Sequence, residues 1–206
     1  MSSVLKLYSQ ELHPRYPSKR ILDIVSSGLF FLVSLPIILP IMALIKMESE
    51  GPIIFSQKRY GQNKEPFTVY KLRTMYSGND NQPVPVDSDD ERLTRVGKII
   101  RKYRVDELPQ LLNTLTGDLS MVGPRAYQEL NAKEMIALGF DDRFDIPQGI
   151  VCYSNLEEDS SIATPQKKME LDRPYIDAYK SGNYSLLEDI RLLCRTVAVM
   201  IKGYGI

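Results

Sequence analysis

The chain lacks most of the residues on which metal and thiol chemistry depend. Its 206 residues include no tryptophan, one histidine (His13) and two cysteines, Cys152 and Cys194. Because the two cysteines are far apart in sequence, neither a disulfide framework nor a zinc-thiolate site is expected, and a reducing compartment is indicated. The sequence also contains no internal repeat and no glycine-rich nucleotide loop. If the protein catalyses a reaction, carboxylates surrounded by arginine and lysine are the residues expected to do it.

The formal net charge is zero, but the charges are unevenly distributed. Residues 1–125 contain 17 lysines and arginines against 13 aspartates and glutamates, and residues 126–206 contain 9 against 13. A local basic excess of this size favours an anionic ligand or an anionic membrane surface, and we expect no nucleic-acid partner. The length suits one ordinary domain with a short appended element.

One long apolar segment indicates a membrane location. Residues 24–45 carry no charge and are flanked by Lys19, Arg20 and Lys46. A helix of this length reaches about 33 Å, enough for a bilayer core of about 30 Å. Cations at both ends favour two cytoplasmic ends. Ser34 and Pro36 predict a break or kink near residues 33–36.

We therefore predict a re-entrant membrane helix over residues 19–46 that turns at Ser34 and Pro36, preceded by an N-terminal tail, residues 1–18. A kinked spanning helix and a buried core helix are the alternatives.

The remaining pattern predicts a mostly helical α+β protein. Residues 53–75 are expected to form a β-hairpin with its turn at 61–66, and alternation puts Lys71 and Arg73 on one face of the second strand. Those two cations are either solvated or one wall of an anion site. Residues 77–91 and 145–165 are expected to be loops. Helices are expected over residues 92–103, 108–115, two stretches of 126–180, and 186–201, the last opened by a capping box at Ser185–Glu188.

The helix predicted over residues 92–103 is basic and amphipathic. Its charged positions include five lysines and arginines and no acid, while an apolar stripe runs along the other face. Such a helix either lies on an anionic membrane face or packs its stripe on the core as an ordinary surface helix.

The cationic run ends abruptly in Asp106 and Glu107, followed by Pro109. Asp106 stands where a helix N-cap is expected, and capping is the default explanation for it. The same position also suits chemistry on phosphate, because the amides at a helix start attract anions. Arg125 follows a Gly123–Pro124 turn, and its guanidinium group is well suited to phosphate oxygens.

Several of these segments together resemble the bacterial sugar transferase family, the monotopic polyprenyl-phosphate phosphoglycosyl transferases. The resemblance runs from Lys19 to Thr196, over most of the chain. It is carried by QKRYG at 57–61, YKLRTM at 70–75, VDELPQLLN at 105–113 and GDLSMVGPR at 117–125. So many matches at fixed spacing are far more specific than any one of them.

The resemblance implies an enzyme on the cytoplasmic face of the bacterial inner membrane, with residues 47–206 as its catalytic domain. It implies transfer of a sugar 1-phosphate from a UDP-sugar to polyprenyl (undecaprenyl) phosphate, with Mg²⁺ and release of UMP. Asp106 would be the nucleophile that forms a covalent phosphosugar intermediate, and Glu107 and Asp106 would hold the metal. Membrane lipids are expected partners, with downstream glycosyltransferases or a second copy of the chain as further possibilities.

The resemblance also implies supporting roles for other charged residues. Arg125 would clamp a phosphate, and Asp189 matches an acid near the family's site. Three further cations would neutralise diphosphate charge: Lys71, Arg73 and Arg101.

The chain departs from the family pattern in three places. The Ser-Pro break is spaced as Ser34-Leu35-Pro36, the Pro-Arg-Pro motif ends in Ala126, and the Pro-Gly-Ile-Thr-Gly segment is represented only by residues 147–154. Two other classes of function therefore stand beside transfer. One is a catalytically weak membrane scaffold for glycan assembly, and the other is a peripheral binder of anionic lipid.

Overall fold

The computed structural model describes residues 15–78, 90–156 and 164–202. Its elements follow the order α2 (Pro17–Glu48), β1 (Ile54–Tyr60), β2 (Pro66–Leu72), α3 (Arg95–Lys102), η2 (Val105–Glu107), α4 (Gln110–Thr116), β3 (Ser120–Val122), α5 (Glu129–Ala137), η3 (Asp141–Asp145), β4 (Gly149–Val151), η4 (Tyr153–Asn155), α6 (Pro165–Ser181) and α7 (Leu186–Lys202). The mostly helical α+β class is confirmed. Most of the predicted 77–91 loop lies outside the described residues.

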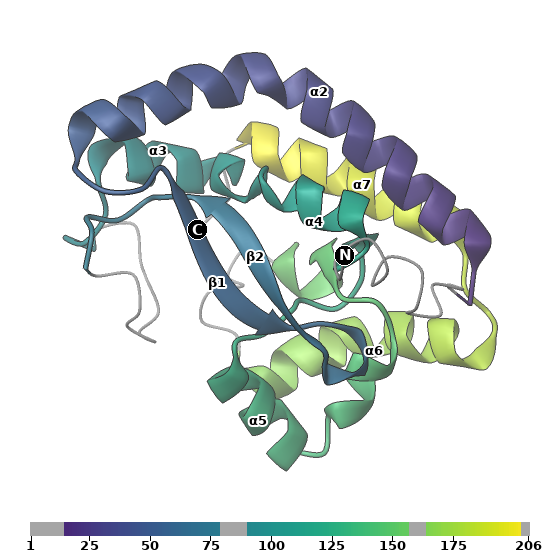
Figure 1. The fold of residues 1–206 in the computed structure, drawn as a ribbon. Coiled ribbons are helices and arrows are strands. Elements are labelled where there is room, and N and C mark those ends of the chain that lie inside the picture. The colour runs from purple at the N-terminus through teal and green to yellow at the C-terminus, as the bar shows by residue number, and fades with distance from the viewer. Residues whose placement is uncertain (1–14, 79–89, 157–163, 203–206) are drawn as a thin grey trace, which may run out of the picture.

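Helix α2 arches over one side of the molecule (Figure 1). It is 32 residues long and continues through Pro36 and Pro40. The helix is therefore not broken near residues 33–36, where a break or kink was predicted. Each proline removes one amide donor, and the Ser34 hydroxyl donates to the Phe31 carbonyl at 2.8 Å. The helix begins two residues before and ends two residues after the predicted 19–46 segment.

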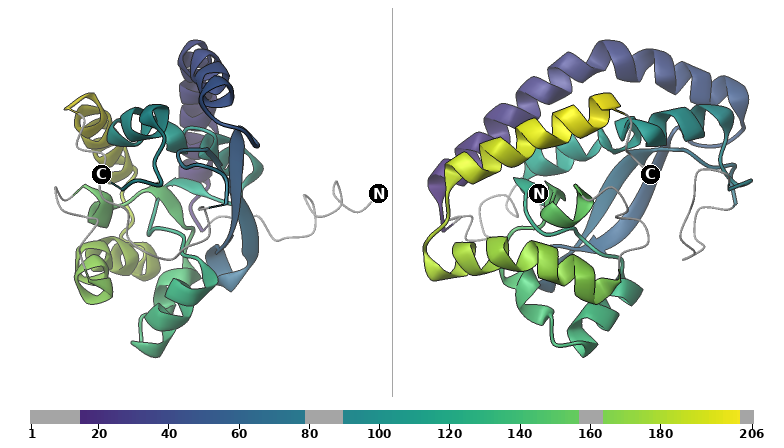
Figure 2. Two further views of the ribbon diagram at one scale, coloured as in Figure 1. Left: turned by 90° about the vertical axis from the view of Figure 1, so that its left-hand side faces the viewer. Right: turned by 180° about the vertical axis from the view of Figure 1, so that it is seen from behind.

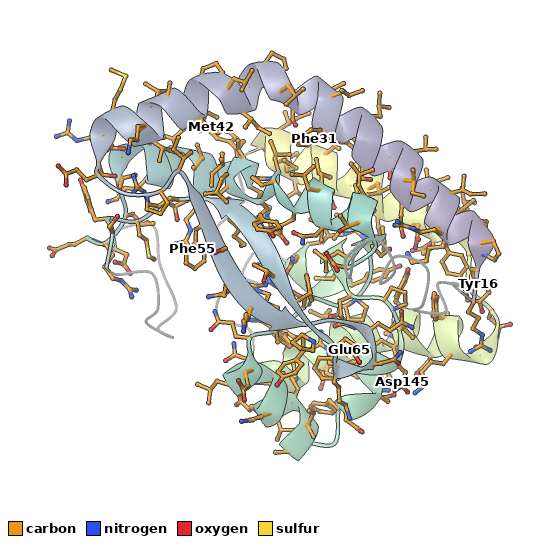
Figure 3. The ribbon with its side chains drawn as sticks, viewed as in Figure 1. Tyr16, Phe31, Met42, Phe55, Glu65 and Asp145 are labelled. Atoms are coloured by element: carbon orange, nitrogen blue, oxygen red, sulfur yellow. The ribbon has the colours of Figure 1, made fainter. Side chains whose placement is uncertain are left out.

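The two faces of α2 differ sharply. Phe31 and Met42 point toward the body of the protein (Figure 3), where they pack against two buried apolar clusters. The opposite face exposes a run of large apolar side chains: Ile21, Ile24, Val25, Leu29, Leu32, Val33, Ile37, Leu39, Leu44 and Met47. By length and composition α2 is able to cross a membrane. A buried core helix does not leave such a face exposed, so that alternative is wrong.

Strands β1 and β2 form the predicted antiparallel hairpin, with Ile54 opposite Leu72 and Tyr60 opposite Pro66. Helix α3 begins beside the end of α2, because the Glu48 carboxylate accepts hydrogen bonds from the amides of Arg95 and Val96 at 2.6 and 3.0 Å. The basic helix predicted over 92–103 is confirmed in the shorter span of α3. Its buried Ile100 joins the apolar cluster beneath the second half of α2.

A short parallel pair, β3 and β4, was not predicted, since residues 145–165 were expected to be a loop. Ser120 pairs with Gly149 and Val122 with Val151. The two backbones approach so closely at Gly123 that a Cβ atom there would lie 2.4 Å from the Pro147 carbonyl oxygen. Glycine is therefore required at the turn that leads to Arg125.

The C-terminal helices complete the body. Views from the front and from behind place α5 at the end of the molecule away from α2 (Figures 1 and 2). The C-terminal part of α6 reaches the start of α2, where the Tyr16 hydroxyl donates to the Tyr179 carbonyl at 3.0 Å. Buried Tyr179 of α6 and Leu192 of α7 belong to the largest apolar cluster, against which Phe31 of α2 also packs. The predicted C-terminal helix is confirmed, but Glu188 accepts a hydrogen bond from the Tyr153 hydroxyl, and no capping-box bond from Ser185 is present among the described residues.

Candidate active site

Asp106 and Glu107 lie together in the single turn η2, between α3 and α4. The turn follows Arg104, whose φ of 54° is left-handed and redirects the chain at the end of α3. The Asp106 carboxylate caps no helix: α4 begins after Pro109 and has no side-chain cap. The capping interpretation of Asp106 is therefore wrong, because the intervening 3₁₀ turn moves the helix start three residues downstream.

Glu107 is held by two cations from separate elements. Its Oε1 atom lies 2.5 Å from Lys71 Nζ of β2 and 2.9 Å from Arg125 Nη2, which follows β3. Burial alone would raise the pKa of Glu107, but the charges of Lys71 and Arg125 outweigh it and hold that pKa well below its ordinary value. Glu107 is therefore a fixed anion whose second oxygen, Oε2, has no partner among the described residues.

Asp106 has the opposite environment. It is only 6% exposed, and its carboxylate has no hydrogen bond or ion pair within the described ranges. Burial raises its pKa, while the charge of Lys71 lowers it, Glu107 raises it, and Arg101 and Arg125 lower it further. The net shift is upward. The two adjacent carboxylates thus differ in their surroundings. Glu107 is held in two ion pairs, and Asp106 is free to react or to bind a ligand.

Arg125 is fixed from behind by backbone contacts. The Gly149 amide donates to the Pro124 carbonyl at 2.9 Å, and the buried Arg143 side chain donates to the Arg125 carbonyl at 3.0 Å. The thiol of Cys152 is near the Arg125 charge, but burial raises the pKa of Cys152 to about 12. That thiol stays protonated at neutral pH, so the residue is not a thiolate nucleophile.

Arg59 belongs to this site, and the sequence analysis did not single it out. Its guanidinium donates to the Ala126 carbonyl at 2.9 Å and to Gln57. Burial lowers the pKa of Arg59 to about 10, the Arg125 charge lowers it too, and Glu107 opposes both. The QKRYG motif contained the signal. Alternation places Arg59, two residues along the strand from Gln57, on the same face as Gln57.

Arg101 lies near the carboxylate pair, since its charge lowers the pKa of Asp106. Two other predicted site residues lie elsewhere. Arg73 follows the end of β2 and donates to the carbonyls of Ser49 and Glu50 at 2.7 and 2.6 Å, at the C-terminal end of α2. Lys71 and Arg73 therefore have different partners, although the hairpin pairing continues to Arg73, whose amide donates to the Ile53 carbonyl at 2.9 Å.

Asp189 is part of the structural interior. It is fully buried, forms an ion pair with Lys19 at 2.7 Å, and accepts hydrogen bonds from the hydroxyls of Tyr175 and Tyr184 at 2.9 and 2.8 Å. Lys19 also donates to the Val122 carbonyl at 2.8 Å. Asp189 thus joins α7 to the start of α2 and to β3, and it has no contact with Asp106 or Glu107 among the described hydrogen bonds and ion pairs.

The described residues contain no group of three or more His, Cys, Asp or Glu side chains able to enclose a metal ion. The free Asp106 carboxylate and the Oε2 atom of Glu107 nevertheless fit Mg²⁺. That ion is commonly held by one or two carboxylates together with substrate phosphates and water.

Comparison with known proteins agrees with this geometry. The bacterial sugar transferase family model matches residues 14–203. The chain is 35% identical to the uncharacterized sugar transferase EpsL of Bacillus subtilis, over 91% of this chain and 89% of that protein. It is 36% identical to the UDP-glucose:undecaprenyl-phosphate glucose-1-phosphate transferase of Caulobacter vibrioides, over 89% and 69%.

A third relative is the UDP-N-acetylgalactosamine-undecaprenyl-phosphate N-acetylgalactosaminephosphotransferase of Aeromonas hydrophila. It is 32% identical over 91% of this chain but only 44% of its own length. The family model and these relatives define the class of protein as a transferase, here with a long apolar helix near the start of the chain. The chain belongs to the bacterial sugar transferase family.

The raised pKa of Asp106 predicts a stability difference. Its folded pKa exceeds the ordinary 3.8, so the folded state binds this proton more tightly than the unfolded state, and ionisation destabilises the fold as the pH rises above 3.8. Asp106→Asn should therefore unfold at a higher temperature than the wild type at about pH 7, with the difference shrinking toward about pH 4. Thermal unfolding by circular dichroism in detergent with a metal chelator measures this.

The control is Asp141→Asn, an exposed aspartate 3.5 Å from Lys64, which should change the midpoint little at either pH. A neutral-pH midpoint for Asp106→Asn below that of the wild type would contradict the assignment of Asp106 as an unpartnered buried charge.

Proposed function

We propose that this protein transfers a sugar 1-phosphate from a UDP-sugar to a polyprenyl phosphate, the first step in assembling a glycan on a lipid. The observation that carries the proposal is the difference in surroundings between Asp106 and Glu107. Glu107 is neutralised by Lys71 and Arg125, which leaves Asp106 as a buried carboxylate without a partner. Two of the relatives above are named for this type of transfer.

The proposed chemistry has two displacements at one phosphorus. An Asp106 oxygen attacks the β-phosphorus of the UDP-sugar, the bond from that phosphorus to the bridging oxygen breaks, and UMP leaves with the electron pair. A phosphate oxygen of the lipid then attacks the same phosphorus and releases the Asp106 carboxylate. Covalent catalysis of this kind replaces one difficult displacement by two easier ones.

The surrounding cations suit the charge that develops during transfer. Arg125 and Lys71 are already paired to Glu107 and need little reorganisation to face a diphosphate, and Arg59 adds a third, partly buried cation. Preorganised positive charge helps most where water is excluded. We further propose that Asp106 and the free oxygen of Glu107 hold Mg²⁺, which would neutralise phosphate charge when bound.

We propose that the exposed apolar face of α2 lies in the membrane and that the helix enters and leaves on the cytoplasmic side. Both ends of α2 are tied to the same body: Lys19 to Asp189 at one end, and Arg73 to the Ser49 and Glu50 carbonyls at the other. Between these ends α2 arches over the body (Figure 1), and the apolar side chains of its outer face are exposed. A helix that crossed the membrane completely would have to pull one end off this body.

The transfer predicts a covalent adduct in the absence of the lipid acceptor. Purified protein with Mg²⁺ and a panel of UDP-sugars should release UMP and gain the mass of a sugar phosphate, detected by intact-protein mass spectrometry. Asp106→Asn should gain no mass and release UMP at least about a thousandfold more slowly. The control Cys194→Ser changes an exposed thiol and should behave as the wild type.

Unchanged turnover in Asp106→Asn would exclude Asp106 as the nucleophile. If the wild type releases UMP from none of the UDP-sugars, the proposed transfer is wrong and the scaffold alternative is favoured.

The membrane arrangement predicts that both ends of α2 react from one side. Ser18→Cys and Glu50→Cys, both at exposed polar positions beside the ends of α2 and made in a Cys194→Ser background, would be treated with an impermeant maleimide. Inside-out vesicles should be labelled at both positions and intact spheroplasts at neither. Labelling of one position in spheroplasts would show a spanning helix.

A further inference from the structure

The segment that departs most from the family pattern, residues 147–154, leads into η4, and η4 contacts the candidate site. Each residue of this turn contacts a different element. The Tyr153 hydroxyl bonds Glu188 of α7, the Ser154 amide donates to Asp172 of α6 at 3.0 Å, and the Asn155 carbonyl accepts from Arg104 Nη2 at 2.7 Å. The last contact ties η4 directly to the residue that begins the Asp106–Glu107 turn.

Arg104 and Asn155 each retain a buried donor without a partner. Neither Arg104 Nε nor Asn155 Nδ2 has a hydrogen-bond partner, and Asn155 is 9% exposed. No carboxylate pairs with Arg104 among the described residues. Leaving a buried donor unpaired is unfavourable, so two of them on residues that touch each other call for an acceptor.

The electrostatic surroundings specify an anionic acceptor. Arg104 stands at the start of the η2 turn, two residues before Asp106 and three before Glu107. Arg104 therefore adds positive charge to a site where Glu107 is already neutralised twice. The left-handed backbone at Arg104, with φ of 54°, is an uncommon conformation for arginine and points to a role for this placement.

We propose that Arg104 and Asn155 form a subsite for a phosphate oxygen of the substrate, on the η4 side of the Asp106–Glu107 turn. The inference rests on the proposed function, because that function supplies two phosphate groups beside Asp106. The nucleotide diphosphate and the lipid phosphate offer the same chemistry, an anionic oxygen that accepts N–H donors. The guanidinium and the amide recognise that oxygen together, and η4 holds them side by side.

The first test measures anion binding to the full-length protein in detergent. Calorimetric titrations with inorganic pyrophosphate, UDP and a short-chain polyprenyl phosphate would compare the wild type with Arg104→Met. Loss of a charge-assisted contact should weaken pyrophosphate binding about tenfold or more. The matched control is Lys102→Met, which removes an exposed positive charge two residues earlier and should change binding less than about twofold.

The two substrate probes separate the sources of the oxygen. Weaker binding of UDP alone assigns the subsite to the donor, and weaker binding of the polyprenyl phosphate alone assigns it to the acceptor. If all three ligands bind Arg104→Met as they bind the wild type, the subsite does not exist.

Asn155→Asp distinguishes recognition from a merely structural role. The substitution keeps the shape and the backbone contact, and places a carboxylate beside the Arg104 guanidinium. The new ion pair should leave the thermal midpoint unchanged or raise it, while the added negative charge repels a bound phosphate and weakens pyrophosphate binding about tenfold or more. Unchanged binding by the folded variant would overturn the proposal.

UMP release, measured on the same preparations, separates this inference from the proposed function. Arg104-dependent pyrophosphate binding in a protein that releases no UMP would support the subsite and refute the transfer. Active release by the wild type, with equal pyrophosphate binding in Arg104→Met, would refute the subsite and leave the transfer intact.

Discussion

The site depends on one buried carboxylate that is shared by two cations. Glu107 accepts from Lys71 of β2 and from Arg125 beyond β3, so three segments distant in sequence meet at one oxygen atom. Removing a partner from this largely buried pair, whose Lys71 and Glu107 side chains are 15% and 13% exposed, leaves an uncompensated charge and destabilises the fold. The same arrangement leaves Asp106 without a partner, and the candidate chemistry follows from that difference.

The apolar helix is part of the support for this site. Near its start, the Asp23 carboxylate accepts from the Ser120 hydroxyl and the Met121 amide at 2.9 and 2.8 Å, and Lys19 donates to the Val122 carbonyl. These contacts hold all of β3, which leads through Gly123 to Arg125. The position of α2 and the position of Arg125 are therefore linked through a few buried polar contacts.

Much of the fold was predictable because its elements have strong periodic patterns. The hairpin, the basic helix and the long apolar helix were predicted from alternation, helical spacing and length. Asp106 and Glu107 were singled out because the chain has almost no histidine or cysteine to do chemistry, and the structure places them together in η2 beside Lys71 and Arg125. The paired strands β3 and β4 were not, since three-residue strands have no detectable period.

The remaining differences come from tertiary contacts that the sequence pattern does not encode. Lys71 and Arg73 seemed equivalent by alternation, but Lys71 pairs with Glu107, whereas Arg73 donates to the carbonyls at the end of α2. Asp189 was expected to be an acid of the candidate site, yet it pairs with the buried ammonium of Lys19, 170 positions away in the sequence. Buried charges pair with groups that lie close in space, and neither sequence spacing nor helix or strand propensity shows which groups those are.

A double-mutant cycle between Lys71 and Glu107 tests the central claim most directly. Free energies of unfolding would be measured for Lys71→Met, Glu107→Gln and the double variant under one set of detergent conditions. The shared buried ion pair predicts that Lys71→Met alone is strongly destabilising, and that the double variant loses clearly less than the sum of the single losses. Additive losses would show that the two side chains do not depend on each other, and would contradict the account of the site.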